Sequence, residues 1–170
     1  MSIQIELLGP DDSDVLQRVL PDVFDDPVQP DLVREFLADV RHHLLVALED
    51  GWVVGMISAV DYLHPDKAPQ LWINEVGVAP SHQRRGIGKQ LLRAMLEHGR
   101  ARGCTEAWLG TEESNVAANR LYQSAGIAPE PFLLYAFPLG LENSPTPTHP
   151  GFTGASGDRS APESRNASSI

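Results

Sequence analysis

The sequence predicts an α/β sandwich in which helices flank a mixed, mostly antiparallel sheet, in the order β-α-α-β-β-β-α-β-α-β. Two apolar runs on either side of Glu49-Asp50-Gly51 indicate a β-hairpin. An amphipathic stretch over residues 87–102 lies between two further apolar runs, and a helix in that place connects parallel strands. The length of 170 residues suits one domain with its own core.

The first third of the chain is expected to hold a strand, two helices and the hairpin. Residues 3–7 alternate between apolar and polar side chains, as in a short strand. Polar capping residues predict a helix over residues 11–24, and prolines after it precede a second helix over 31–41. The two hairpin strands are expected over residues 44–48 and 52–60.

The second half continues the alternation of strands and helices. An apolar run over residues 71–80 predicts a third strand, after the two strands of the hairpin. The stripe of apolar side chains over residues 87–102 predicts the crossover helix. Gly103 is placed to stop that helix, and residues 105–111 resemble a strand. The last two expected elements are a helix over residues 116–124 and a strand over 131–139.

Charge is distributed unevenly along the chain. The formal net charge of -10 argues against nucleic acid as a partner. Residues 1–60 carry 12 acidic and 3 basic side chains, whereas residues 61–137 carry 8 of each. Two electrostatic characters in one chain suggest two ligands of opposite sign. The alternative is that the acidic surface only aids solubility.

Targeting signals are not evident in the sequence. There is no signal-peptide pattern and no apolar run near ~18 residues. The single cysteine, Cys104, fits a reducing compartment and a small core residue. We therefore expect a cytoplasmic protein without membrane contact. From about residue 142 the composition becomes rich in Ser, Pro, Thr and Gly, so we expect a domain over residues 1–138 and a disordered tail over 139–170.

A glycine-rich stretch, HQRRGIG, stands where the crossover helix begins. The first turn of a helix has free N–H groups and a positive dipole end. Gly86 and Gly88 remove the side chains that would keep an anion away, and Arg84, Arg85 and Lys89 add positive charge. The stretch therefore predicts a phosphate or pyrophosphate site, the alternative being a glycine-rich turn with solvated basic residues.

Two common phosphate-binding motifs do not fit this stretch. A P-loop would need glycine at position 83 and Ser or Thr at position 90, and both positions hold glutamine. A dinucleotide fingerprint would need glycine at position 91, which is leucine. The remaining pattern is Gln-x-x-Gly-x-Gly, which follows a strand and opens a helix.

This pattern resembles the acetyl-CoA pyrophosphate loop of the GNAT N-acetyltransferase superfamily. A second block, NVAANRLYQSAGI, is similar to that family's Asn-x-x-Ala-x-x-Leu-Tyr-x-x-x-Gly-Phe, with Ile127 in place of the final aromatic residue. The strand and helix order fits over residues 1–138. The resemblance implies a GNAT-like fold and acetyl-CoA as cosubstrate. It assigns these coenzyme-binding residues: Gln83, Arg84, Arg85, Gly86, Gly88, Lys89 and Asn115, of which Asn115 could also cap its helix.

A finer resemblance is to the type I aminoglycoside 3-N-acetyltransferases. It is carried by YLHPDKAPQL and by WINEVGVAPSHQRRGIG, which follow the strand VVGMISAV. That subgroup has an acidic residue eight positions before the pyrophosphate motif, and here the position holds Glu75. The resemblance implies acetylation of an aminoglycoside at the 3-amino group, which confers antibiotic resistance.

Acetyl transfer from a thioester to an amine needs a proton acceptor, because an alkylammonium has a pKa of about 10. Glu75 is our candidate for this base, or for the anion that orients the amine, since alternation along its strand points it opposite to Val76 and Val78. The alternative is an edge carboxylate in water. The charged oxygen of the reacting carbonyl also needs a preorganised hydrogen-bond donor.

The resemblance assigns the remaining roles at the reacting centre. The Val76 N–H would polarise the thioester carbonyl, and the backbone from Val76 to Val78 would pair with the pantetheine arm. This arrangement needs a splayed strand, which Gly77 would permit. Tyr122 would lie near the sulfur and protonate it, the alternative being a core aromatic side chain.

A polycationic acceptor would suit the acidic first third of the chain. Candidate carboxylates in expected loops are Asp25, Asp26, Asp61, Glu112 and Glu113, each alternatively a solvated surface charge. The six histidines show no metal-ligand spacing, so no metal is expected.

Three functions stay open from the sequence. The first is an aminoglycoside acetyltransferase that transfers the acetyl group directly in a ternary complex. The second is a GNAT enzyme for another amine, such as a polyamine, an amino acid or a protein N-terminus. The third is a non-catalytic acyl-CoA-binding module. By analogy with the family, a homodimer is one expected assembly.

Overall fold

The computed structural model describes residues 2–135, 137 and 139. The chain divides into two units, which cover residues 1–130 and 131–170. All helices and strands of the described residues belong to the first unit. Almost all of the tail predicted over residues 139–170 lies outside the described residues.

The described elements follow the predicted order closely. The strands are β1 (Gln4–Leu7), β2 (His42–Glu49), β3 (Trp52–Tyr62), β4 (Gln70–Val78) and β5 (Glu106–Trp108). The α-helices are α1 (Pro30–Ala38), α2 (Ile87–Ala101) and α3 (Val116–Gln123). Two short 3-10 helices, η1 (Ser13–Gln17) and η2 (Pro80–His82), precede α1 and α2.

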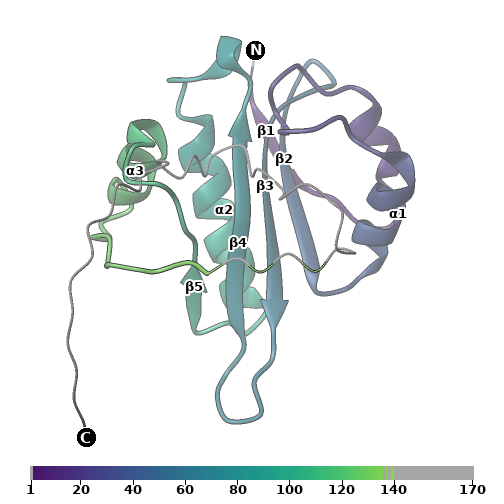
Figure 1. Ribbon diagram of the computed structural model, residues 1–170. Coiled ribbons are helices and arrows are strands. Elements are labelled where there is room, and N and C mark those ends of the chain that lie inside the picture. The colour runs from purple at the N-terminus through teal and green to yellow at the C-terminus, as the bar shows by residue number, and fades with distance from the viewer. Residues whose placement is uncertain (1, 136, 138, 140–170) are drawn as a thin grey trace, which may run out of the picture. The chain divides into compact units, whose positions relative to one another are not determined.

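The strands form one sheet in the order β1-β2-β3-β4-β5. The first four strands are antiparallel, and β5 pairs parallel to β4. The change of direction follows from α2, which carries the chain from the end of β4 back to the start of β5. The predicted mixed, mostly antiparallel sheet is confirmed, and Figure 1 shows α2 and α1 on opposite sides of it.

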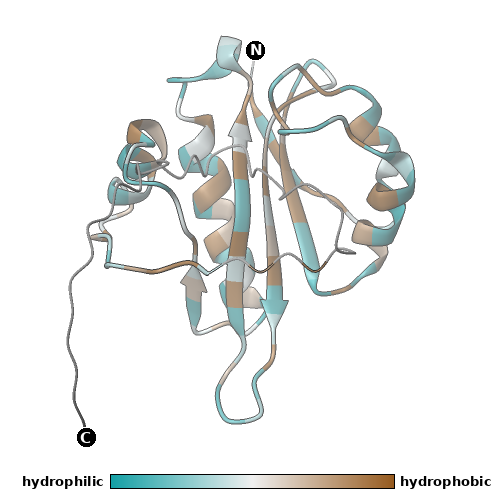
Figure 2. Ribbon diagram, viewed as in Figure 1, coloured by the Kyte–Doolittle hydropathy of each residue, from teal (hydrophilic) through white to brown (hydrophobic). Residues whose placement is uncertain are grey.

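Two apolar clusters cover the two faces of this sheet. On β2 the buried side chains alternate, so that Leu45 and Ala47 pack towards α2 whereas Leu44 and Val46 pack towards α1 and η1. Because both faces are covered, β2 has a continuous apolar run. Figure 2 shows the apolar residues of α2 on the side of the helix that meets the sheet. The apolar cluster under α2 includes Ile57, Leu71, Ile73, Ile87, Leu91 and Met95.

The helix predicted over residues 11–24 is wrong. Only η1 forms there, and the chain then runs beside the start of β3. The Val53 N–H donates to the Arg18 carbonyl at 2.8 Å, and the Leu20 N–H donates to the Val53 carbonyl at 2.9 Å. Pro21 also disfavours a helical conformation at Leu20. Pairing with β3 therefore replaces the helical hydrogen bonds.

The strand predicted over residues 131–139 is also wrong for the part of it that the structure describes. Residues 131–135, 137 and 139 are assigned to no strand. Apolar composition alone does not make a strand, because strand propensity depends on a partner and on side-chain packing. The strand predicted over residues 105–111 is shortened to β5 for a related reason, since its pairing with β4 ends at Trp108.

Candidate active site

The start of α2 has the geometry of an anion site. Gly86 caps the helix in the left-handed conformation, at φ 81°, and no side chain caps the first turn. The first helical bond runs from the Gln90 N–H to the Gly86 carbonyl at 3.1 Å. The N–H groups before Gln90 therefore have no partner within the helix, as is typical of a helix N-terminus that holds an anion.

The two glycines of this turn serve different purposes. A Cβ added at Gly86 meets no atom within 4 Å, so Gly86 is required by its left-handed backbone. A Cβ added at Gly88 would come within 3.3 Å of Leu121 Cδ2, so Gly88 lets α3 pack closely against α2. The prediction for Gly88 therefore gains a packing role that the pattern did not indicate.

Gln83 and Arg85 were predicted from the sequence to bind the anion. In the structure, both side chains contact other protein groups. The Gln83 side-chain amide donates to the Val78 carbonyl at 3.2 Å. The Arg85 guanidinium donates two hydrogen bonds to Glu49, from Nη1 at 3.0 Å and from Nη2 at 2.5 Å. Arg84, at φ 61°, and Lys89 have no ion-pair partner among the described residues.

Among the described residues, no strand pairs with one edge of the second half of β4, which we call its open edge. Strand β5 pairs with β4 only between Gln70 and Trp72. On the other edge, the Ala79 N–H donates to Val54 on β3 at 3.0 Å. Because successive N–H groups of a strand point to opposite sides, the Val78 and Val76 N–H groups point away from β3. These two N–H groups lie at the open edge of β4, which is compatible with the splayed strand that the resemblance implies.

An irregularity in β4 sets the direction of Glu75. Ser58 pairs with Glu75 but Ala59 pairs with Ile73, so Asn74 is an extra residue in the ladder. As a result Val76 and Val78 join the cluster under α2, as Ile73 does three residues before Val76. Glu75 lies on the other face of the sheet, as predicted from alternation.

The carboxyl group of Glu75 is half-buried and lies near Asp25 and Asp26. Burial, together with the negative charges of these two aspartates, raises the pKa of Glu75 to about 6. A hydrogen bond from the Asp25 backbone partly offsets this rise. A carboxyl group with this pKa is mostly ionised at neutral pH and is basic enough to accept a proton. The structure thus brings three of the predicted acidic residues together.

The segment that carries Asp25 and Asp26 is held against β4 by a contact that the sequence did not reveal. A Cβ added at Gly77 would lie 1.9 Å from the backbone oxygen of Val23. Val23 itself is buried, at 1% exposure. Gly77 is therefore required because the Val23 backbone crosses directly over it. The only signal of this contact in the sequence was Gly77 itself, close to Glu75. It did not reveal the crossing segment, because Val23 lies over fifty positions earlier in the chain.

Asp61 lies in β3 and has protein partners, so its predicted place in a loop is wrong. It lies near the end of β3 and is buried, at 8% exposure. Its carboxylate accepts a hydrogen bond from Arg102 Nε at 3.0 Å and lies 3.5 Å from His43 Nε2. His43 in turn contacts His98, with 3.0 Å between Nδ1 and Nε2. Asp61 is therefore used within the protein.

The predicted pair Glu112 and Glu113 lies in the turn before α3. The backbone carbonyls of both residues accept hydrogen bonds from the Asn119 side chain, at 2.9 and 3.4 Å. The Glu112 carboxylate also accepts a hydrogen bond from Ser114 at 3.2 Å. These contacts stabilise the turn and leave the Glu113 side chain exposed.

Asn115 caps α3, as one of its two predicted roles requires. Its side-chain oxygen accepts a hydrogen bond from the Ala118 N–H at 3.1 Å.

We expect Asn115→Ala to lower the free energy of unfolding by about 1 kcal/mol, because the Ala118 N–H loses its partner. Asn115→Asp keeps the acceptor and should retain stability. Denaturant unfolding of both variants measures the difference, and equal stability of Asn115→Ala and the wild type would contradict the capping role.

Tyr122 lies on α3 and is half-buried against the cluster under α2. Burial raises the pKa of its hydroxyl group, so the group remains protonated at neutral pH. This protonated state is compatible with proton donation, and the packing also fits the alternative of a core aromatic residue.

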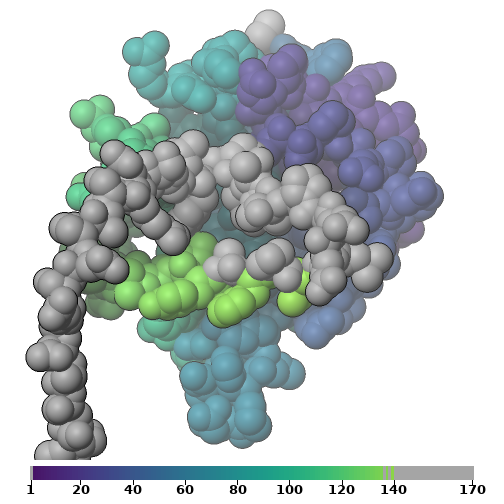
Figure 3. Space-filling model, in the orientation of Figure 1, coloured from purple at the N-terminus to yellow at the C-terminus, as the bar shows by residue number. Residues whose placement is uncertain are grey.

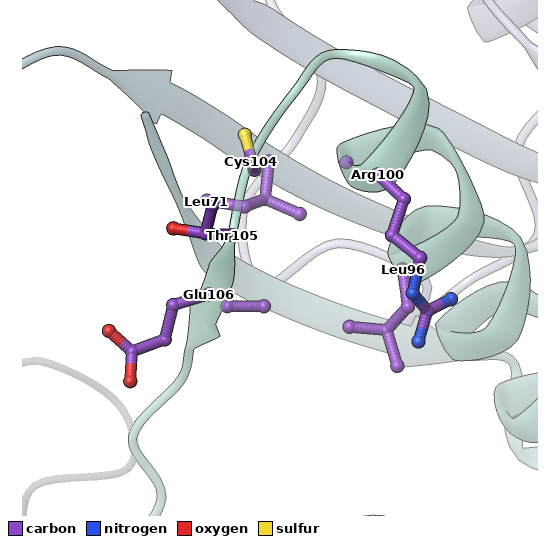
Figure 4. Close-up of a pocket in the computed structure, with 8 residues that line it drawn as sticks. Leu71, Leu96, Arg100, Cys104, Thr105 and Glu106 are labelled. Atoms are coloured by element: carbon purple, nitrogen blue, oxygen red, sulfur yellow. The ribbon is translucent and has the colours of Figure 1, made fainter. Parts of the chain in front are cut away.

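Two hollows on the surface are lined by residues that do not include Glu75. One of about 110 Å³ lies between the end of α2 and the start of β5, and Figure 4 shows its Arg100 and Glu106 side chains pointing apart. Another, of about 350 Å³, lies along α2 between Lys89 and Arg100 and reaches Ser124.

Within the part of the chain that the structure describes, no three His, Cys, Asp or Glu side chains form a metal-binding group. In that same part, no helix combines the length and apolar character needed to cross a membrane.

The chain is similar to known proteins in sequence and in structure. Residues 13–127 match the Acetyltransferase (GNAT) family. N-acetyltransferase family 8 member 3 of Rattus norvegicus is 32% identical over 116 residues, which are 68% of this chain and 51% of that protein. Aminoglycoside N(6')-acetyltransferase type 1 of Salmonella typhimurium is 31% identical over 85 residues, which are 48% of this chain and 59% of that protein.

A solved structure shares the fold. An aminoglycoside acetyltransferase from an uncultured soil metagenomic sample, in complex with sisomicin, aligns with a TM-score of 0.71 at 22% identity. The alignment covers 81% of this chain and 97% of that chain. By contrast, this chain spans about half the length of the first curated relatives it matches.

Proposed function

Since this chain belongs to the Acetyltransferase (GNAT) family, we propose that it transfers an acetyl group from acetyl-CoA to a primary amine of a cationic small molecule. The observation that carries the proposal is the open edge of β4 with the half-buried Glu75 carboxyl group beside it. The edge offers backbone donors for the donor substrate, and the carboxyl group offers a proton acceptor for the amine.

Coenzyme binding is proposed at the start of α2 and along β4. The uncapped N–H groups of the first turn, with Arg84 and Lys89, would hold the pyrophosphate. The Val76 and Val78 backbone would pair with the pantetheine arm, which extends the sheet at its open edge. The Val76 N–H is the candidate donor to the thioester oxygen.

The chemical roles follow from protonation states. Glu75, ionised above its pKa of about 6, would accept the proton that the amine loses as the nitrogen–carbon bond forms. The carbon–sulfur bond then breaks, and Tyr122, kept protonated by burial, is the candidate that returns a proton to sulfur. Both partners are present together in this scheme, so transfer is direct and no acetyl group is held by the protein.

The acceptor is proposed to be cationic because three carboxyl groups converge at the site. Asp25 and Asp26 add negative charge beside Glu75. In Figure 3 the acidic first third of the chain, purple to dark blue, gathers at one side of the visible face. An aminoglycoside fits this charge, and the similarity to an aminoglycoside acetyltransferase from Salmonella typhimurium supports that choice.

The position of acetylation is a separate question. The sequence resemblance favoured the 3-amino group, whereas the aminoglycoside relative is named for the 6' position. The product of any aminoglycoside that is turned over should therefore be assigned by NMR. We also retain two alternatives, namely another amine acceptor and a non-catalytic acyl-CoA-binding module.

A thiol-release assay over an amine library tests the proposal. With acetyl-CoA as donor, we expect release of free thiol with aminoglycosides and slow or no release with amino acids and neutral amines. Turnover confined to polyamines, amino acids or peptide N-termini would select the second function. Tight acetyl-CoA binding in a calorimeter, without turnover on any amine, would select the binding module.

A further inference from the structure

We propose that Glu49 positions the coenzyme-binding loop, and that Arg85 serves as the anchor of this loop and not as a ligand of the pyrophosphate. The inference rests on the proposed function for its ligand. It concerns a residue on β2 that is distant in sequence from the glycine-rich stretch. Glu49 is a positioning residue, since it acts through Arg85 and His82.

The contacts of Glu49 account for both of its carboxylate oxygens. Oε1 accepts from Arg85 Nη2 at 2.5 Å, and Oε2 accepts from Arg85 Nη1 at 3.0 Å. Oε2 also lies 2.9 Å from His82 Nε2, and the other ring nitrogen of His82 lies 2.8 Å from Ser81 Oγ. The Glu49 side chain is only 13% exposed, whereas the Arg85 side chain, at 41%, reaches the surface.

The place of Glu49 makes it a firm attachment point. It is the last residue of β2 and pairs with Trp52 across the hairpin that joins β2 to β3. His82 ends η2, and Arg85 directly precedes the Gly86 cap of α2. The carboxylate therefore ties the middle and the end of the segment between β4 and α2 to the sheet. Held in this way, Arg84 and Gly86 keep the left-handed conformations that expose the N–H groups of α2.

The charges agree with this division of roles. Contact with Arg85, and then with His82, holds the pKa of Glu49 at about 2, so this carboxylate is ionised at any physiological pH. It neutralises the Arg85 charge by direct contact. Lys89 and Arg84 are therefore the cations left to attract an anion at this helix end.

Calorimetric titration with CoA distinguishes an anchor from a ligand, because only the anchor role predicts weaker CoA binding when Glu49 is replaced. If Arg85 is an anchor, Glu49→Gln loosens the loop and weakens CoA binding by about tenfold. If Arg85 is a pyrophosphate ligand, Glu49→Gln frees its charge, and CoA binding strengthens or stays equal. The second result would overturn the inference. Glu97→Gln is the matched control, since Glu97 pairs with Arg93 on the exposed side of α2 and should change nothing.

A double-variant cycle and a shorter donor separate positioning from general damage. The effects of Glu49→Gln and Arg85→Gln on CoA affinity should not add, because the two residues act as one unit. With S-acetylpantetheine, which lacks the pyrophosphate, Glu49→Gln should keep the wild-type kcat/KM. Additive effects, or an equal loss with both donors, would contradict positioning of this loop.

Amide hydrogen exchange tests the anchor without any ligand. In Glu49→Gln we expect faster exchange of the Gln83 and Gln90 N–H groups, which donate to the Pro80 and Gly86 carbonyls, with the protection of β3 unchanged. If wild-type protein binds no CoA, the proposed function fails, whereas faster exchange would still support the anchor. Unchanged exchange would overturn the anchor even where CoA binds.

Discussion

Glu75→Gln is expected to lower kcat/KM by about 10²- to 10⁴-fold, the range that a positioned acid or base contributes. The amide cannot accept a proton, and it removes the charge that faces the incoming cation. Acetyl-CoA affinity and the unfolding midpoint should stay near the wild-type values, because Glu75 lies on the opposite face of β4 from Val76 and Val78. Steady-state rates with the best acceptor, together with calorimetry, measure these quantities.

The pH dependence gives the same prediction a second test. The pKa of Glu75 is about 6 and is raised above its ordinary value, so the protonated and inactive form accumulates below pH 6. The ratio of wild-type to Glu75→Gln kcat/KM should therefore rise with pH through about 6 and level off above it. Taking the ratio removes the ionisation of the acceptor amine, which is common to both proteins. A ratio that does not change with pH would rule out Glu75 as the ionising group.

Sequence periodicity predicted most of the fold because most elements are stabilised by their own residues. The crossover helix α2 combines an apolar stripe with a glycine stop at Gly103, whose φ is 83°. The β2–β3 hairpin is encoded by Asp50 and Gly51, both of which have positive φ. Local signals of this kind do not depend on distant contacts.

The errors occur where a distant partner decides the conformation. Capping residues at the start of η1 predicted a helix that continues to residue 24, yet Val53 on β3 pairs with the residues after η1 through the backbone of Arg18 and Leu20. Nothing near residue 18 in the sequence records that partner. Asp61 was misplaced for the same reason, since its partners are Arg102, forty-one positions later, and His43 on the neighbouring strand.

The candidate site divides along the same line. The anion site could be predicted because its glycines and the helix that they cap are adjacent in sequence. The environment of Glu75 could not, because it depends on residues 22–26 crossing the sheet and on the extra residue Asn74 in β4. The pattern indicated a carboxylate on this strand, and only the fold supplies the burial and the neighbouring charges that raise its pKa.

Gly77→Ala is expected to lower the free energy of unfolding strongly, although it adds only one methyl group. The new Cβ would lie 1.9 Å from the Val23 oxygen and 3.0 Å from its carbonyl carbon, and both are backbone atoms. The backbone of a buried segment has to move, which costs about 3 kcal/mol or more. Gly110→Ala is the matched control, because a Cβ there meets nothing within 4 Å and should change stability by less than about 0.5 kcal/mol.

Displacement of the Val23 backbone in Gly77→Ala should also change the pH dependence of activity, which an unfolding experiment does not measure. Val23 leads directly into Asp25 and Asp26, so moving its backbone carries these charges away from Glu75 and admits water. The pKa of Glu75 should then fall towards its ordinary value, and the acid limb of kcat/KM should move to lower pH. If a folded Gly77→Ala protein keeps its acid limb at about 6, the crossing segment does not set the pKa of Glu75. An acid limb at lower pH, with CoA affinity retained, would identify this crossing segment as the element that makes the Glu75 carboxyl group basic enough to accept a proton.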